Sequence, residues 1–230
     1  EELLSIGAGN KTIHAGQYLG GEGLPLTDDE LRLMVALHAD AHAQKLRGAR
    51  WSIDVDLCKE RKIHRLTEIL KRLGLSYQTG SRSPQGMGTL PVTRLRLPSC
   101  ALITRLLSYI CPEDDWSKRR WGSWLLQLSR QQLDVFTEEI WHWNSYAEGR
   151  TDYANRDKTN ADWVQAALVL SGVRTSLKFY TSNKQTSVWI ARVRRTQTNA
   201  ITHRAERKRV PWSGQVYCVT VPSDAIVIRR

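Results

Sequence analysis

Two segments of this chain repeat one helix pattern. Residues 27–30 (TDDE) precede the apolar run 31–41 (LRLMVALHADA), and residues 129–132 (SRQQ) precede 133–145 (LDVFTEEIWHWNS). Both starts have the Ser/Thr-x-x-Glu/Gln pattern of a capping box, in which the first and fourth side chains each accept a hydrogen bond from the other residue's backbone N–H. The repetition predicts two equivalent helices and therefore a chain built from two related halves.

An offset of 98 residues aligns much of the chain after these helices. It places Gly74 on Gly172 and the strand 92–96 (VTRLR) on 190–194 (IARVR). The two capping boxes are 102 residues apart (129 − 27), so the second half has four fewer residues than the first between its capping box and the aligned segments (102 − 98), and the loop-like stretch 146–156 lies in that interval. A helix, a glycine and an Arg-x-Arg strand that recur in one order favour tandem duplication over chance similarity.

Length and composition agree with two halves. A chain of 230 residues can bury one large core or two small ones, and the repeat favours two. No stretch is long and apolar enough to span a bilayer, and the first residues lack the order of a signal peptide. Cys58, Cys100, Cys111 and Cys218 show no C-x-x-C spacing, which argues against a zinc site or a disulfide framework. We expect a soluble cytoplasmic protein with free thiols.

The positive charge of the chain indicates a polyanionic partner. Lys and Arg number 34 against 23 Asp and Glu, the formal net charge is +11, and seven of these cations lie within 192–209. Each phosphate that a cation neutralises releases condensed counterions, which strengthens binding to nucleic acid. The alternative is a solvated basic face on a protein with another role.

Arginines alternate with apolar residues in the predicted strands. In 89–97 (TLPVTRLRL), Arg94 and Arg96 lie on one face while leucines lie on the other. The second copy places Arg192 and Arg194 in the same way. Guanidinium groups on an open sheet face suit phosphate contacts and bidentate pairing with guanine, so these four residues are candidate DNA ligands.

Lys178 extends this set, because it lies opposite the apolar neighbours of its own predicted strand. An alternative for each of these cations is an ion pair with a neighbouring element of the protein. The strand 51–57 (WSIDVDL) also alternates, but it carries Asp54 and Asp56 on its polar face, where carboxylates would repel DNA. The role of these two carboxylates stays open at this point.

Each repeated helix ends in a short polar residue, Asp40 in 33–41 (LMVALHADA) and Asn144 in 137–145 (TEEIWHWNS). The first of these nine-residue segments resembles the motif of the LAGLIDADG homing endonucleases. The second resembles the Trp-Asp-Gly ending of phage members of that family, with Asn144 at the position of Asp. Taken with the duplication, the chain is similar to the phage or bacterial intein-encoded type of LAGLIDADG homing endonuclease.

This resemblance implies an α+β fold. Two pseudo-symmetric αββαββα halves would form a saddle-shaped antiparallel sheet, with helices packed behind it. The first half would span 27–110, the second half 129–209, and a linker of residues 111–128 would join them. The resemblance also implies a monomer that acts on a double-stranded DNA target site in the cytoplasm of a bacterial or phage-infected cell.

The resemblance further implies metal-dependent phosphodiester hydrolysis at the two helix ends. Asp40 and Asn144 would be the catalytic residues and would hold Mg²⁺, for which Mn²⁺ or Ca²⁺ could substitute in binding. Bound divalent ions activate water and stabilise transition-state charge, and hard ions prefer oxygen ligands. Because an amide at position 144 lacks the charge of a carboxylate, three alternatives stay open: a nickase, a non-cleaving DNA binder, or an Asp deliberately replaced by its isostere.

The two ends of the chain carry a second resemblance. Residues 214–221 (GQVYCVTV) resemble the late splicing block of an intein, with Cys218 at a position that some inteins fill with Cys in place of Asp. Residues 1–26 and 210–230 are therefore interpreted as splicing-domain remnants on either side of the endonuclease. One alternative is a plain terminal β-hairpin. For the whole chain, the alternatives are a non-cleaving DNA-binding protein of the same fold and an RNA-binding maturase.

Overall fold

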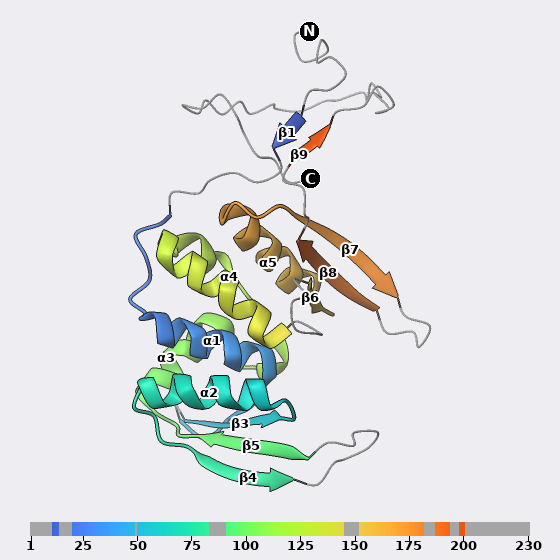
Figure 1. The fold of residues 1–230 in the computed structure, drawn as a ribbon. Coiled ribbons are helices and arrows are strands. Elements are labelled where there is room, and N and C mark those ends of the chain that lie inside the picture. The colour runs from blue at the N-terminus through green and yellow to red at the C-terminus, as the bar shows by residue number, and fades with distance from the viewer. Residues whose placement is uncertain are drawn as a thin grey trace.

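The computed structural model describes residues 11–13, 20–48, 50–82, 91–144, 152–181, 187–193 and 198–200. Helices and antiparallel strands alternate through this part of the chain, which gives a mixed α+β fold (Figure 1). No helix in the described residues is long and apolar enough to cross a membrane.

The first half forms an αββαββα unit, in agreement with the predicted fold. Its elements in chain order are α1 (Asp28–Asp40), β2 (Ala41–Lys45), β3 (Trp51–Leu57), α2 (Glu60–Arg72), β4 (Gln78–Arg82), β5 (Val92–Leu97) and α3 (Ala101–Ile110). The strands form one antiparallel sheet in the order β2-β3-β5-β4. Burial alternates along β3 and β5, where Val55 and Leu95 are fully buried, so one sheet face packs on the core and the other carries polar residues.

The second half repeats this order in part. Its described elements are α4 (Arg130–Asn144), β6 (Asp152–Asn155), α5 (Lys158–Leu170), β7 (Thr175–Thr181) and β8 (Ser187–Val193). β6, β8 and β7 form an antiparallel sheet in the order that β3, β5 and β4 have in the first half. The first strand and the last helix of the αββαββα unit predicted for this half fall outside the described residues. A separate antiparallel pair joins β1 (Lys11–Ile13) to β9 (Thr198–Ala200).

Both predicted capping boxes are present. At the start of α1, the Thr27 hydroxyl accepts from the Glu30 N–H at 3.3 Å, and the Glu30 carboxylate accepts from the Thr27 N–H at 2.8 Å. At the start of α4, the Ser129 hydroxyl accepts from the Gln132 N–H at 3.2 Å, and the Gln132 side-chain carbonyl accepts from the Ser129 N–H at 3.3 Å. Local side-chain chemistry therefore fixes where both helices begin.

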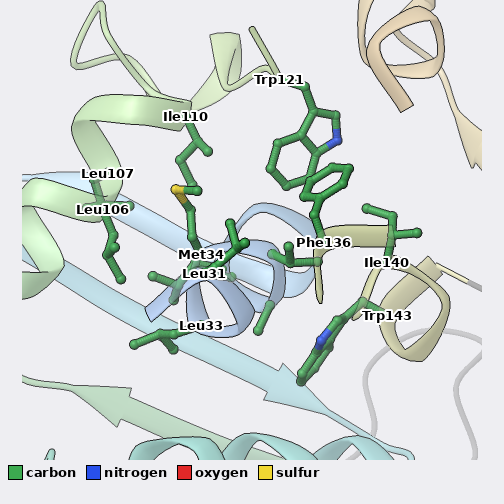
Figure 2. Packing of buried hydrophobic residues seen from close by; sticks show 14 of the residues in the cluster. Leu31, Leu33, Met34, Leu106, Leu107, Ile110, Trp121, Phe136, Ile140 and Trp143 are labelled. Atoms are coloured by element: carbon green, nitrogen blue, oxygen red, sulfur yellow. The ribbon is translucent and has the colours of Figure 1, made fainter. Parts of the chain in front are cut away.

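The helices α1 and α4 lie side by side between the two sheets (Figure 1). Leu31 and Met34 of α1 and Phe136 and Ile140 of α4 are fully buried in one apolar cluster (Figure 2). Burying side chains of this size stabilises a fold by roughly 1.5–3 kcal/mol each. The helix pair is therefore the shared core of the two halves.

The segment 111–128, predicted as a linker, is part of this core. Trp121 is fully buried, and its ring lies edge-on to Phe136 of α4 at a centroid distance of 5.1 Å (Figure 2). Its backbone N–H donates to the Asn160 side-chain carbonyl at 2.8 Å, and its Nε1–H donates to the Tyr153 hydroxyl at 3.2 Å. The segment contains two short 3-10 helices, Trp116–Lys118 and Ser123–Gln127. It therefore joins the halves by packing as well as by chain continuity.

The 98-residue offset is confirmed through the middle of each half. The helices α2 and α5 begin 98 residues apart (158 − 60), and they are followed by Gly74 and Gly172, with φ of 63° and 81°. In both, the N–H after the glycine donates to the carbonyl five residues before it, at 2.9 and 2.8 Å. This helix ending needs a left-handed residue, which glycine adopts without strain.

The last strand of each half departs from that offset by two residues. Gln78 pairs with Arg96 in the first sheet, and Ser176, which lies 98 residues later, pairs with Arg192 in the second. The separation of the partners is 18 residues in the first hairpin (96 − 78) and 16 in the second (192 − 176). Arg192 therefore stands at the position of Arg96. The predicted match of Arg192 with Arg94 is therefore wrong by two residues, which is one position along the same strand face.

Candidate nucleic-acid and metal site

Asp40 and Asn144, the predicted catalytic pair, are the last residues of α1 and α4. Both helices run in the same general direction, and their C-terminal ends lie on the side toward which β4 and β7 also point (Figure 1). After Asp40 the backbone becomes extended at Ala41 (φ −77°, ψ 152°), so the chain passes directly from α1 into β2. The two polar side chains therefore lie between the sheets, on one side of the molecule.

Lys62 and Arg61, in the first turn of α2, join the two helix ends. The Lys62 ammonium forms an ion pair with the Asp40 carboxylate, and it lies 5.7 Å from the ring centroid of Trp143 in the last turn of α4. The Arg61 guanidinium donates to the His142 carbonyl at 2.6 Å. Asp40 is thereby brought to the end of α4. Lys62 was not among the residues predicted for the site, because its partners lie on helices that meet only in the fold.

Asn144 is half-buried, and its Nδ2 is enclosed without a hydrogen-bond partner among the described residues. An enclosed amide nitrogen without an acceptor is uncommon and unfavourable. A phosphate oxygen or a water could accept from it, and a rotation of the amide would place Oδ1 there instead. The described part of the chain therefore supplies no hydrogen-bond partner for one polar atom at the end of α4.

A buried carboxylate one turn before Trp143 holds this end of α4 in place. Glu139 is fully buried and forms an ion pair with Arg65 of α2, while the Arg32 Nε of α1 lies 3.7 Å away. Trp143 donates its Nε1–H to the same carboxylate at 2.8 Å. The hydrogen bond with Glu139 raises the pKa of Arg65 above its ordinary value. The sequence offered no sign of Glu139, because a helical Glu beside other polar residues is usually exposed.

His38 supports the end of α1 from the core side. It is almost completely buried and stacks on Trp121, with ring centroids 3.7 Å apart. Arg119 donates to the His38 carbonyl at 2.9 Å. Burial, followed by the nearby positive charge of Arg119, lowers the pKa of His38 to about 3. The imidazole is therefore neutral wherever the protein is folded near neutral pH.

Because His38 is buried as a neutral imidazole, we expect the free energy of unfolding to fall in acid. The unfolded chain protonates His38 near 6.5, whereas the folded chain resists protonation down to about 3. The stabilisation is therefore complete above pH 6.5 and is lost as pH falls toward 3, by up to about 1.4 kcal/mol per pH unit. We expect denaturant unfolding between pH 7 and 4 to show a steeper decline for the wild type than for His38→Phe, which keeps an aromatic ring without a titrating group. Parallel declines in the two proteins would contradict this assignment.

The arginines predicted to bind DNA from the first sheet form ion pairs with the neighbouring strand. Arg94 donates its Nε–H and Nη2–H to the Asp56 carboxylate, both at 2.7 Å. Arg96 donates in the same way to Asp54, at 2.8 and 3.1 Å. Hydrogen bonds from Arg96 and Arg94 hold the pKa values of Asp54 and Asp56, respectively, below their ordinary range. The carboxylates of β3, which the sequence left without a role, are the partners of these arginines.

The second sheet carries one pair of the same kind. Arg192 donates its Nε–H and Nη2–H to Asp152, both at 2.8 Å. Lys178 is exposed on the same sheet face, because Ser176, two residues before it, is the cross-strand partner of Arg192. Arg194 lies outside the described residues. The structure therefore brings Arg94, Arg96, Arg192 and Lys178 to exposed sheet faces.

Comparison with known sequences does not assign the chain to a family. No family model matches the chain. A curated relative, the β subunit of ribonucleoside-diphosphate reductase from Aquifex aeolicus (strain VF5), is 26% identical over 127 residues. The match covers 50% of this chain but only 17% of the reductase subunit, so the chain spans a small part of that protein.

Comparison with solved structures shows the fold. A structure of mesophilic variants of the homing endonuclease I-DmoI has a TM-score of 0.50 at 12% identity, covering 73% of this chain and 89% of that one. I-DmoI in complex with DNA and Ca also gives a TM-score of 0.50, at 14% identity, covering 73% of this chain and 83% of that one. The chain thus shares the two-domain α+β fold of LAGLIDADG homing endonucleases.

Proposed function

We propose that this chain is a metal-dependent endonuclease that cuts double-stranded DNA at a specific site. The observation that carries this proposal is the meeting of Asp40, Lys62 and the end of α4 between two sheets with arginines on their exposed faces. Structures of the same fold bound to DNA with Ca or Mn support the partner and the use of a divalent ion. The net charge of +11 supports a polyanionic substrate.

Asp40 is the metal-binding residue in this proposal, with Asn144 as a weaker second ligand. A carboxylate is the hard oxygen donor that Mg²⁺ prefers, and an amide oxygen is an uncharged alternative. No group of three His, Cys, Asp or Glu side chains in the described residues could hold an ion alone. Phosphate oxygens of DNA and water would complete the ligand set. A divalent ion bound there would activate water and stabilise charge on the phosphate.

Lys62 has a role in this scheme that depends on DNA. Without DNA it neutralises Asp40 and so opposes the binding of a cation. A phosphate at the helix ends would offer Lys62 a second anion, which would release the Asp40 carboxylate toward the metal. Metal binding at Asp40 and DNA binding would therefore strengthen each other.

We further propose that the endonuclease acts as a monomer and is carried within an intein. A match to 17% of a reductase subunit fits a segment inserted into a host protein. Residues 1–26 and 210–230 would then flank the endonuclease as splicing-domain remnants. A plasmid that carries an uninterrupted gene for the reductase β subunit is therefore the first cleavage substrate to test, with Mg²⁺ and with Mn²⁺.

Duplex binding should show the salt dependence of phosphate contacts. The logarithm of the binding constant should fall linearly with the logarithm of salt concentration, and Lys178→Ala should flatten that slope by about 1. Fluorescence anisotropy of a labelled duplex between 50 and 200 mM salt would measure this. Lys118→Ala is the matched control, because Lys118 is exposed but is already paired with Glu113. Salt-insensitive binding would exclude the sheet faces as the DNA surface.

A non-cleaving DNA-binding protein of this fold is the second candidate. The amide at Asn144 favours it, because one of the two helix ends lacks a charged metal ligand. Both candidates predict the same DNA binding, so only cleavage separates them.

A further inference from the structure

The three Asp–Arg pairs on the sheet faces share one geometry. In each, the carboxylate takes the Nε–H and one Nη2–H of the guanidinium: Asp56 with Arg94, Asp54 with Arg96, and Asp152 with Arg192. Each pair joins residues that are direct cross-strand partners on adjacent strands. The arginine planes are therefore fixed before any DNA arrives.

The remaining edge of these guanidinium groups suits a base better than a phosphate. With Nε and one Nη2 hydrogen occupied, Nη1 and the second Nη2 hydrogen form a fork toward solvent, and the Arg96 and Arg192 side chains are 55% and 49% exposed. A phosphate on that fork would lie close to the aspartate charge and be repelled. The O6 and N7 atoms of guanine are neutral acceptors that accept this fork bidentately.

Resting on the proposed DNA-cutting function, we propose that Arg96 and Arg192 read guanines at corresponding positions of the two half-sites. Asp54 and Asp152 act as positioning residues that hold the forks. The register makes Arg96 and Arg192 equivalent, because they occupy the same place opposite Gln78 and Ser176.

The same register makes the target unequal in its two halves. Arg94 pairs with Asp56 in the first sheet, and the corresponding cross-strand partners in the second are Ile190 and Ala154. An apolar pair there can contact the methyl group of thymine but cannot pair with guanine. The first half-site therefore has a second guanine next to the shared one, and the second half-site lacks it.

Selection of binding sites from a randomised duplex library tests this specificity. The wild-type chain should enrich guanine at one position in each half-site and at a further position in one half only. Arg96→Ala should reduce the preference for guanine about tenfold at a single position and leave the other half-site unchanged. Arg192→Ala should do the same in the opposite half.

Substitution of the aspartates distinguishes whether the arginines recognise bases or contact phosphates. Asp54→Asn and Asp152→Asn should weaken the guanine preference at the same positions as the arginine variants, without lowering affinity for non-specific DNA. Asp134→Asn is the matched control, because its ion pair with Arg130 lies at the start of α4. If the asparagine variants strengthen binding to every sequence and leave base preference unchanged, the arginines contact phosphate and the proposal is wrong. Failure of the wild type to bind any duplex would instead refute the proposed function itself.

Discussion

Asn144→Asp should raise double-strand cleavage by on the order of a hundredfold or more. The substitution changes one nitrogen to oxygen at the end of α4, so packing is retained while the second helix end gains a charged metal ligand. An anionic oxygen holds a divalent ion much more firmly than an amide does in a partly dehydrated site. Cleavage of both strands needs charge stabilisation at both scissile phosphates, and the wild type supplies a carboxylate at one helix end.

The measurement is the rate of linear and nicked product formation from a supercoiled plasmid that the protein binds, with Mg²⁺ and with Mn²⁺. Asp40→Asn added to the Asn144→Asp variant should abolish double-strand cleavage again. Gln127→Glu is the control, because it adds the same charge at an exposed position before α4. If Asn144→Asp binds its site and still cuts neither strand, the endonuclease proposal fails and the non-cleaving DNA binder replaces it.

Local rules were sufficient for the parts of the fold that depend on neighbours in sequence. Thr27 and Ser129 with their partners three residues later place both helix starts, and the left-handed glycines at 74 and 172 end the equivalent second helices. Alternation along β5 placed Arg94 and Arg96 on the polar face. These signals need only the geometry of one turn or one strand.

Those local rules do not predict which side chains of different helices and strands contact each other. The partners of Arg96 and Arg192 depend on the register of β5 on β3 and of β8 on β6, and in each half a helix and a strand separate these partners in sequence. Lys62 meets Asp40 only because α1 and α2 pack together. The linker appeared separate from the halves, yet Trp121 makes it part of the core. In each case the deciding partner lies far away in sequence.

The arginine pairs also change the meaning of the net charge. Three of the five predicted DNA ligands are neutralised by aspartates in the protein without DNA. They therefore add little to non-specific attraction, which depends on unpaired charge. Exposed lysines such as Lys178 supply that attraction in this scheme, whereas the paired arginines supply selectivity. Affinity and specificity are thereby assigned to different residues of the same surface.

Glu139→Gln should lower the free energy of unfolding by about 2–4 kcal/mol. The carboxylate is fully buried between Arg65 and Arg32, and its removal leaves the Arg65 guanidinium without its anion at the junction of α1, α2 and α4, while Arg32 keeps its ion pair with Asp29 at 3.0 Å. The effect stays below that of a fully enclosed pair, because the two arginine side chains are 28% and 22% exposed. Glutamine retains an acceptor for the Trp143 Nε1–H, so the loss measures charge rather than volume.

Denaturant unfolding of Glu139→Gln beside Glu138→Gln measures this effect with a matched control. The two residues are neighbours on α4, but Glu138 is exposed, and its substitution should change stability by less than about 0.5 kcal/mol. A triple variant that also replaces Arg65 and Arg32 with methionine should recover much of the loss, because no charge is then left unpaired. Equal stability of the two single variants would show that Glu139 does not stabilise the junction. In that event the orientation of Trp143, and with it the position of Asn144, would rest on helix packing alone.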